Sequence, residues 1–171
     1  GLLLASSEDT FTFPHRTFQE YLAACHLTRA DYPSALGDVV RGDPERWREV
    51  ALLAGAKAGR GAPFALWALI DELIPADPGD AEDASAQLTA LVAGCALAES
   101  ADVDKVTRRD VATLERARRW LRSIVEGDIL APKLRAEAGD VLAAIGDPRF
   151  RDRSQGCLPA DDMLGFVEIP A

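Results

Sequence analysis

The sequence predicts an all-α protein built from antiparallel helix pairs, of the kind stacked in HEAT-like α-solenoids, with a small β-hairpin at the N-terminus. Hydrophobic residues make up 48% of the 171 residues, but aromatic residues only 6%. Most of the apolar residues are Ala and Leu, which favour helices over strands. Apolar residues also recur at intervals of three and four along most of the chain, which is the period of a helix.

The first 14 residues differ from the rest. Residues 2–4 are an apolar run, residues 6–9 are polar and suit a turn, and residues 10–13 alternate polar and aromatic side chains. This alternation is typical of a half-buried strand, so the segment predicts a β-hairpin that ends at Pro14. Two strands are not stable by themselves. We therefore expect the hairpin to pack on the helix that follows.

Helical periodicity begins at His15. Phe18, Leu22 and Cys25 fall at i, i+4 and i+7, with Tyr21 beside them, which predicts an apolar stripe facing inward. If that stripe is buried, replacing Phe18 by alanine costs about 3–5 kcal/mol. The residues expected to form the structural junction between hairpin and helix are Phe11, Phe13, His15, Phe18, Glu20 and Tyr21.

Six more helices are expected after this one. The clearest start signal is Asp43-Pro44, because aspartate caps a helix and proline fits its first position. The expected ranges are 34–40, 44 to the region of 55–61, 63–73, 84–99, 111–124 and 132–145. Short connections make neighbouring helices antiparallel, and pairs of roughly 35–45 residues have the size of HEAT-like units.

Two stretches, with a short third one at the end of the sequence, resemble parts of NACHT-type STAND NTPases. Residues 11–24 read Phe-Thr-Phe-Pro-His-Arg-Thr-Phe-Gln-Glu-Tyr-Leu-Ala-Ala. In that family, a strand reading F-x-F-x-H runs into a helix reading T-F-Q-E-Y-L-A-A, closes a winged-helix-like region and leads into helical repeats. Residues 134–149 resemble a HEAT-type second helix with its Asp-Pro-Arg exit. Residues 166–171, Phe-Val-Glu-Ile-Pro-Ala, resemble the start of a formylglycine-generating-enzyme-like (sulfatase-modifying-factor) domain.

The resemblance implies three regions: a winged-helix-like remnant (1–30), a HEAT-like array (31–149) and a linker toward a downstream domain (150–171). It implies a non-catalytic module of a bacterial protein that relays a signal from a nucleotide switch to a sensor or ligand-binding domain. The chain has no G-x-x-x-x-G-K-[ST] run, so ATP and Mg²⁺ would belong to the parent's nucleotide-binding module. We assign no catalytic, cofactor or metal residue to this chain.

Charge and cysteine content limit the kinds of partner and the cellular location that we expect for this chain. The net charge of −9 argues against nucleic acid, since phosphate contacts need clustered Lys and Arg. No segment has the apolar length of a transmembrane helix, and three widely spaced cysteines are not a secreted disulfide framework, so we expect no membrane partner and a cytoplasmic location. The expected partners are other domains of the same polypeptide, with a protein ligand or self-association as further options.

Other interpretations stay open at this stage. One segment is unusually basic, and it is either a solvated face or a partner surface. Its four candidate residues are Arg108, Arg109, Arg116 and Arg119. The chain could instead be a helical scaffold or regulatory protein-binding domain of an unrelated multidomain protein. A third class is a hydrolase that uses His15 with Cys25 or an acidic residue, although we expect His15 to be structural.

Overall fold

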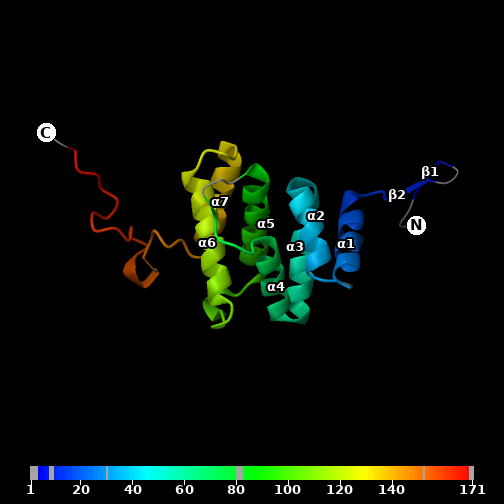
Figure 1. Ribbon diagram of the computed structural model, residues 1–171, viewed down its shortest axis with the longest axis horizontal. Helices are drawn as coiled ribbons and strands as arrows, with labels where there is room; N and C mark the ends of the chain where they lie inside the picture. The colour runs from blue at the N-terminus through cyan, green and yellow to red at the C-terminus, as the bar shows by residue number, and fades with distance from the viewer. Residues whose placement is uncertain (1–3, 8–9, 30, 80–82, 152, 170–171) are drawn as a thin grey trace.

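The computed structural model describes residues 4–7, 10–29, 31–79, 83–151 and 153–169. In this part of the chain, seven α-helices follow a two-stranded hairpin, β1 (Leu4–Ser7) and β2 (Thr10–Thr12), and the all-α prediction is confirmed (Figure 1). The helices are α1 (Arg16–Leu27), α2 (Ser34–Gly42), α3 (Pro44–Gly61), α4 (Pro63–Leu73), α5 (Ala84–Ser100), α6 (Val111–Glu126) and α7 (Pro132–Ile145). Two short 3-10 turns, η1 (Val103–Lys105) and η2 (Arg153–Gln155), lie between and after them.

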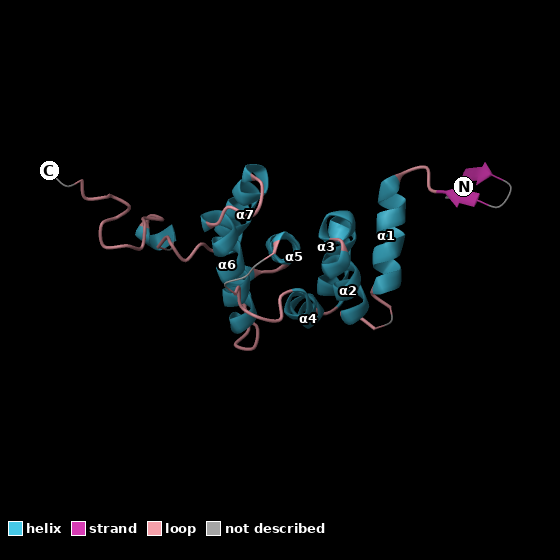
Figure 2. Cartoon of the chain, turned by 45° about the horizontal axis from the view of Figure 1, so that its top comes forward, coloured by secondary structure: helices cyan, strands magenta, loops and turns pink. Residues whose placement is uncertain are grey.

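The helices stack in two layers. In the first layer α2 contacts α4, and α4 contacts α6. In the second layer α1 contacts α3, α3 contacts α5, and α5 contacts α7. The pairs α2–α3, α4–α5 and α6–α7 connect the layers (Figure 2). This arrangement is the one that short connections between antiparallel helices predict. The assignment of these pairs as HEAT-type repeats stays a prediction. The division of the chain into three regions also stays a prediction.

Local sequence signals set the helix starts. The Asp43 carboxylate accepts a hydrogen bond from the Arg46 backbone N–H at 3.1 Å, and Pro44 is the first residue of α3, as predicted. Asp83 caps α5 in the same way, through the Ala86 N–H at 2.6 Å. Each cap satisfies a backbone N–H that has no partner inside its helix.

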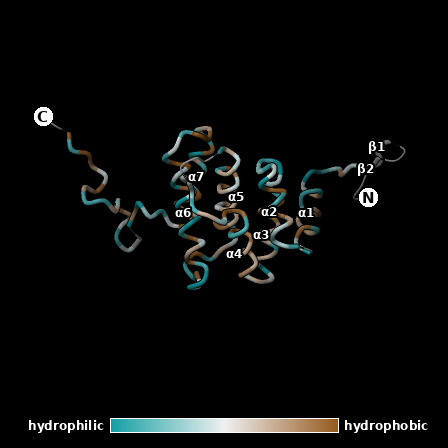
Figure 3. Tube along the Cα trace, in the orientation of Figure 1, coloured by the Kyte–Doolittle hydropathy of each residue, from teal (hydrophilic) through white to brown (hydrophobic). Residues whose placement is uncertain are grey.

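Helix α5 is the centre of the core. Its residues from Thr89 to Leu97 are all buried, so it is covered on every side by α3, α4, α6 and α7. Gly94 allows this close packing, because a Cβ there would lie 2.9 Å from Cδ1 of Leu121 and 3.1 Å from Cγ1 of Val141. Figure 3 shows the apolar character of the central helices α4 and α5.

The hairpin is antiparallel, with Leu4 opposite Thr12 and Ala5 opposite Phe11. The strand β1 includes Ser6 and Ser7, which the sequence placed in the turn, and a register shift lies between Ala5 and Ser7. The predicted strand residues 2–3 and turn residues 8–9 lie outside the described residues. The hairpin extends away from α1, so the expected packing of hairpin on helix is wrong (Figures 1 and 2).

The segment after α7 leaves the array at the opposite end from the hairpin (Figure 1). It closes on itself, because the Arg151 N–H donates to Leu158 O at 2.8 Å and the Ala160 N–H donates to Arg149 O at 2.8 Å. Beyond this closed loop, residues 161–169 are exposed. We call residues 161–169 the tail.

Candidate functional site

The expected junction residues are placed differently from the prediction. Phe11 is 62% exposed, Phe18 43% and Tyr21 52%, and the described contact among the junction residues is between the rings of His15 and Phe18, 6.0 Å apart. Phe13 is partly buried, and the half-buried Glu20 carboxylate pairs with the exposed Arg16 at 2.6 Å. The predicted inward stripe of α1 is therefore its outward face.

Small residues form the inner face of α1. Ala24 is 1% exposed, and Ala23 and Leu27 are half-buried beside it. Alanines let α1 lie close to α3, so the larger Phe18, Tyr21 and Leu22 point elsewhere. The end of α1 is further held by Lys57, whose amine donates to the Thr28 hydroxyl at 3.0 Å. The prediction from periodicity missed this face because it assumed that the largest apolar side chains are buried. The adjacent alanines Ala23 and Ala24 were the signal in the sequence that could have indicated it.

A hollow of about 300 Å³ lies between α1 and α3. The Arg16–Glu20 ion pair borders it on α1, and Trp47 borders it on α3. The guanidinium of Arg46 lies 5.9 Å from the centre of the Trp47 ring, within the range of a cation–π contact. On α1 this hollow is lined by Arg16, Gln19, Glu20 and Ala23, so it lies on the side of the helix away from the exposed aromatic residues.

The four arginines of the predicted partner surface separate into two kinds. Arg116 pairs with Asp71 of α4, which also accepts a hydrogen bond from the Thr113 hydroxyl at 2.6 Å. Arg119 pairs with Asp77 in the connection after α4, at 2.6 Å. Arg116 therefore holds α6 to α4 and Arg119 holds α6 to the connection that follows α4, so neither is a free arginine of a partner surface. The sequence missed this because the partner aspartates lie more than forty residues away.

Arg108 and Arg109 are exposed, and within the described chain no hydrogen bond or ion pair involves either side chain. Arg109 borders a hollow of about 470 Å³ on the first layer of helices. We call this hollow the Phe64 groove. Its lining residues are Arg41, Phe64, Trp67, Ala68, Asp71, Glu72, Pro75, Arg109 and Asp110.

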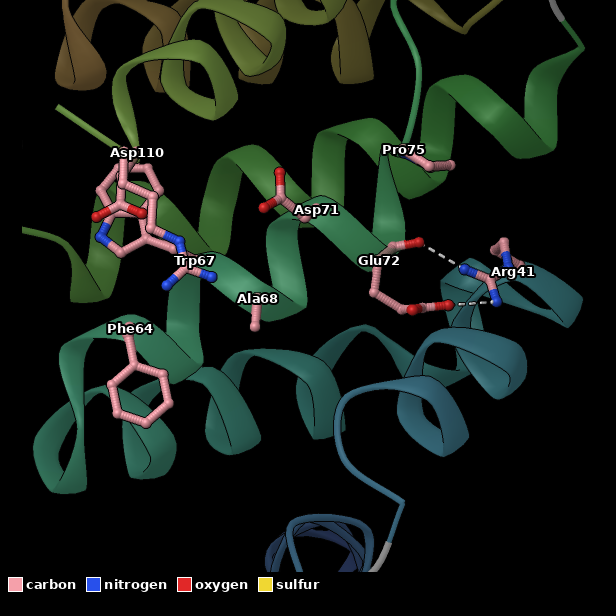
Figure 4. Close-up of a pocket in the computed structure, with 9 residues that line it drawn as sticks. Arg41, Phe64, Trp67, Ala68, Asp71, Glu72, Pro75 and Asp110 are labelled. Atoms are coloured by element: carbon pink, nitrogen blue, oxygen red, sulfur yellow. Dashed lines mark hydrogen bonds and ion pairs between the residues drawn. The ribbon is translucent and has the colours of Figure 1, made fainter. Parts of the chain in front are cut away.

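The two carboxylates of α4 in the Phe64 groove are already paired. Arg41 of α2 donates to the Glu72 carboxylate at 2.9 Å and to the Glu72 carbonyl at 2.6 Å (Figure 4). Asp71 is held by Arg116, as above. The apolar part of the groove is contributed by Trp67, 8% exposed, and Phe64, 67% exposed. The groove therefore offers an exposed aromatic ring beside an unpaired guanidinium.

A third polar link joins α3 to α7 across the edge of α5. Both carboxylate oxygens of Glu137 accept hydrogen bonds from Arg48, which also donates to the Cys95 sulfur at 3.4 Å. The hydrogen bond from Arg48 lowers the pKa of Glu137. Burial raises the pKa of Cys95 to about 11, against the opposing charge of Arg48. At neutral pH Cys95 is thus a protonated thiol and a packing residue.

Among the described residues, no cluster of three or more His, Cys, Asp or Glu side chains is placed to hold a metal ion. His15 is exposed at the start of α1, and Cys25 is half-buried on the same helix. No described helix has both the length and the apolar character needed to cross a bilayer.

The described residues thus define an all-α helical array with exposed surfaces at its ends. A family model described as the winged helix-turn-helix domain C-terminal to NACHT matches residues 1–27. This match supports an association of the chain with NACHT-type proteins, in agreement with the resemblance of residues 11–24. No curated protein and no solved structure matches the chain.

Proposed function

We propose that this chain is a non-catalytic helical module of a bacterial NACHT-type STAND NTPase, and that it couples a nucleotide switch to a downstream sensor or ligand-binding domain. The observation that carries the proposal is the coincidence of the family match over residues 1–27 with the exposed aromatic face of α1. Phe18, Tyr21 and Leu22 on that face are each more than 40% exposed. A hairpin and one helix are too small to form a core alone.

The natural cover for this face is the remainder of a winged-helix domain. Its burial would remove the aromatic rings of Phe18 and Tyr21 from water and would give the hairpin a surface to pack on. In this proposal α1 is shared by the helical array and the winged-helix domain. Its alanine face packs on α3, and its aromatic face would pack on the rest of the winged helix. A movement of the winged helix would then displace α1, and through α1 it would displace α3 and the array.

The array suits a relay because helices that lie next to each other in it are joined by directional polar contacts as well as by apolar packing. Arg41 and Glu72 join α2 to α4, Arg116 and Asp71 join α4 to α6, and Arg48 and Glu137 join α3 to α7. Such links resist sliding of one helix along another, so a displacement at α1 would be passed on as a rigid-body movement. We propose the pairs α2–α3, α4–α5 and α6–α7 as HEAT-like units.

Three further parts of the proposal rest on the sequence and its resemblance and not on the structure. Residues 166–171 support a formylglycine-generating-enzyme-like domain after the tail. The absence of a phosphate-binding run from this chain means that ATP and Mg²⁺ would be held by the preceding module. The cytoplasm is the proposed location.

The test is hydrogen exchange in the full-length polypeptide with ATP and with ADP. We expect α1 amides to change protection between the two nucleotides, and the F18A/Y21A variant to remove that change while nucleotide binding persists. The control is F64A, because Phe64 is also an exposed aromatic residue, at 67%, but lies on α4. Exchange in α1 that does not respond to nucleotide would contradict the relay. A gene without a P-loop upstream would instead favour a scaffold domain of an unrelated protein.

A further inference from the structure

The Phe64 groove and the tail have complementary chemistry. The groove combines the exposed Phe64 ring with Arg109, and Arg108 lies next to it in the chain. Arg41 and Arg116 pair with the two carboxylates of α4, so the lining charges left without an ion pair among the described residues are those of Arg109 and the nearly buried Asp110. The Thr107 hydroxyl donates to the Asp110 carboxylate at 2.6 Å, so this acid is engaged within its own turn. The exposed unpaired charges at this edge of the groove are therefore those of Arg108 and Arg109, and both are positive.

The tail carries the opposite charge. It contains Asp161, Asp162 and Glu168, and no Lys or Arg occurs from residue 154 to the end of the sequence. Its large apolar side chains are exposed: Phe166 by 76%, Val167 by 84% and Ile169 by 88%. Figure 1 shows the tail reaching away from the array, and Figure 3 shows hydrophobic residues along it. An acidic segment with exposed apolar side chains suits a groove with an exposed aromatic ring and free arginines.

We propose that the tail of one copy of this chain docks in the Phe64 groove of a second copy. In this contact Asp162 and Glu168 face Arg108 and Arg109, and the Phe166 side chain covers Phe64. The contact joins two different surfaces, so it is heterologous, and a pair of copies still has one free groove, on the copy that gives its tail, and one free tail, on the other copy. This inference does not depend on the proposed function, because it concerns only residues of this chain.

The geometry favours a second copy over the chain's own groove. The Arg149 carbonyl accepts the Ala160 N–H, so the closed loop places the start of the tail beside Arg149. Arg149 pairs with Asp147 at 2.6 Å. Burial opposes the ionisation of Asp147, but hydrogen bonds from Arg149 and the charges of Arg149 and Arg122 lower its pKa. The start of the tail is therefore held near the part of α6 that contains Arg122.

The Phe64 groove lies at the other end of α6, where Asp110 precedes the first turn. Twelve residues of helix separate Asp110 from Arg122, a rise of about 18 Å. Asp161 and Asp162 are fixed at the start of the tail, so in the same copy they stay far from Arg108 and Arg109. A neighbouring copy has no such restriction.

Sedimentation velocity of the 171-residue chain over a concentration series tests the proposal. We expect the weight-average sedimentation coefficient to rise with concentration, and the rise to weaken with added salt because exposed charges are screened. The R108E/R109E and D162K/E168K variants should each weaken self-association about tenfold or more. These substitutions leave the fold intact, because the four side chains are exposed and Asp161, which caps the turn before Gly165, is unchanged.

Three comparisons make the result specific. A chain with all four substitutions should associate again, because both charges are reversed together. An equimolar mixture of the two variants should also associate, because each supplies the surface that the other lacks. The control R46E makes the same type of change beside the other hollow and should leave association unaltered. The proposal would be overturned if the chain sedimented as a monomer at every concentration, or if R46E weakened self-association as much as the R108E/R109E and D162K/E168K variants do.

Discussion

In the array from α2 to α7 most of the large apolar side chains are buried, with Phe64 an exposed exception, whereas at the two ends of the chain comparable side chains are exposed. Leu69, Leu97 and Leu142 in the array are fully buried, but Phe18 on α1 and Phe166 in the tail are exposed. The array can bury its apolar residues because its helices have neighbours in both layers. The hairpin, the outer face of α1 and the tail lack such neighbours in the described chain. The comparison shows that the array buries most of its own apolar residues, whereas its two ends leave theirs exposed.

The largest effect should come from the centre of the array. Leu121 is fully buried on α6 against Gly94 of α5. We expect Leu121→Ala to lower the free energy of unfolding by about 2–5 kcal/mol, because a cavity forms where two helices lie in close contact. Urea denaturation followed by circular dichroism measures this. A loss below about 1 kcal/mol would show that the core can collapse around the change and that the array is looser than the structure indicates.

The next effect should come from the link between α3 and α7. Replacing Arg48 by methionine keeps much of the side-chain volume but removes the hydrogen bonds to Glu137. We expect a loss of about 1–2 kcal/mol, since both groups are partly exposed and water replaces part of the interaction. Urea denaturation measures it at neutral pH. A matched control is Arg60→Met at the end of α3, where the arginine is exposed, and there the loss should be negligible.

The same link should make stability depend on pH. The pKa of Glu137 in the folded protein lies below its ordinary value of 4.5, chiefly because of the hydrogen bond from Arg48. The stabilisation from the ionised carboxylate is therefore present above about pH 4.5 and is lost as the pH falls through the lowered value. Glu137→Gln should make the acid side of the stability curve less steep. If the free energy of unfolding of Glu137→Gln fell with acid as steeply as that of the unchanged protein, the acid dependence would arise from another carboxylate, for example Asp147.

A smaller effect is expected where an arginine pairs at the surface. Arg119 and Asp77 are each about half exposed, so Arg119→Ala should cost no more than about 1 kcal/mol, and added salt should reduce the difference. Thermal unfolding at low and high salt gives the comparison. A larger loss would indicate that this pair positions the connection that also accepts the Trp120 indole N–H at Ala76 O.

The smallest change in stability is expected from Phe18, whose exposed side chain contrasts with the buried leucines of the array. Because Phe18 is 43% exposed, Phe18→Ala should change the stability of the 171-residue chain by less than about 0.5 kcal/mol. The periodicity alone led to an expected loss of about 3–5 kcal/mol. Ala24→Leu on the opposite face of α1 is the counterpart. It should be destabilising, because the alanine is buried against α3 and a larger side chain does not fit.

The sequence by itself determined the all-α class and the positions of most helices. The 3.6-residue period, together with prolines at helix starts, located α3, α4 and α7 closely, because these signals act within one or two turns. Residues 11–24 were also sufficient to indicate the NACHT association that the family match supports. Only the tertiary structure decided which face of α1 is buried and which arginines are free. The physical reason is that a buried face and an ion pair depend on a neighbour, and the neighbours of Phe18 and Arg116 are set by packing between helices far apart in the chain.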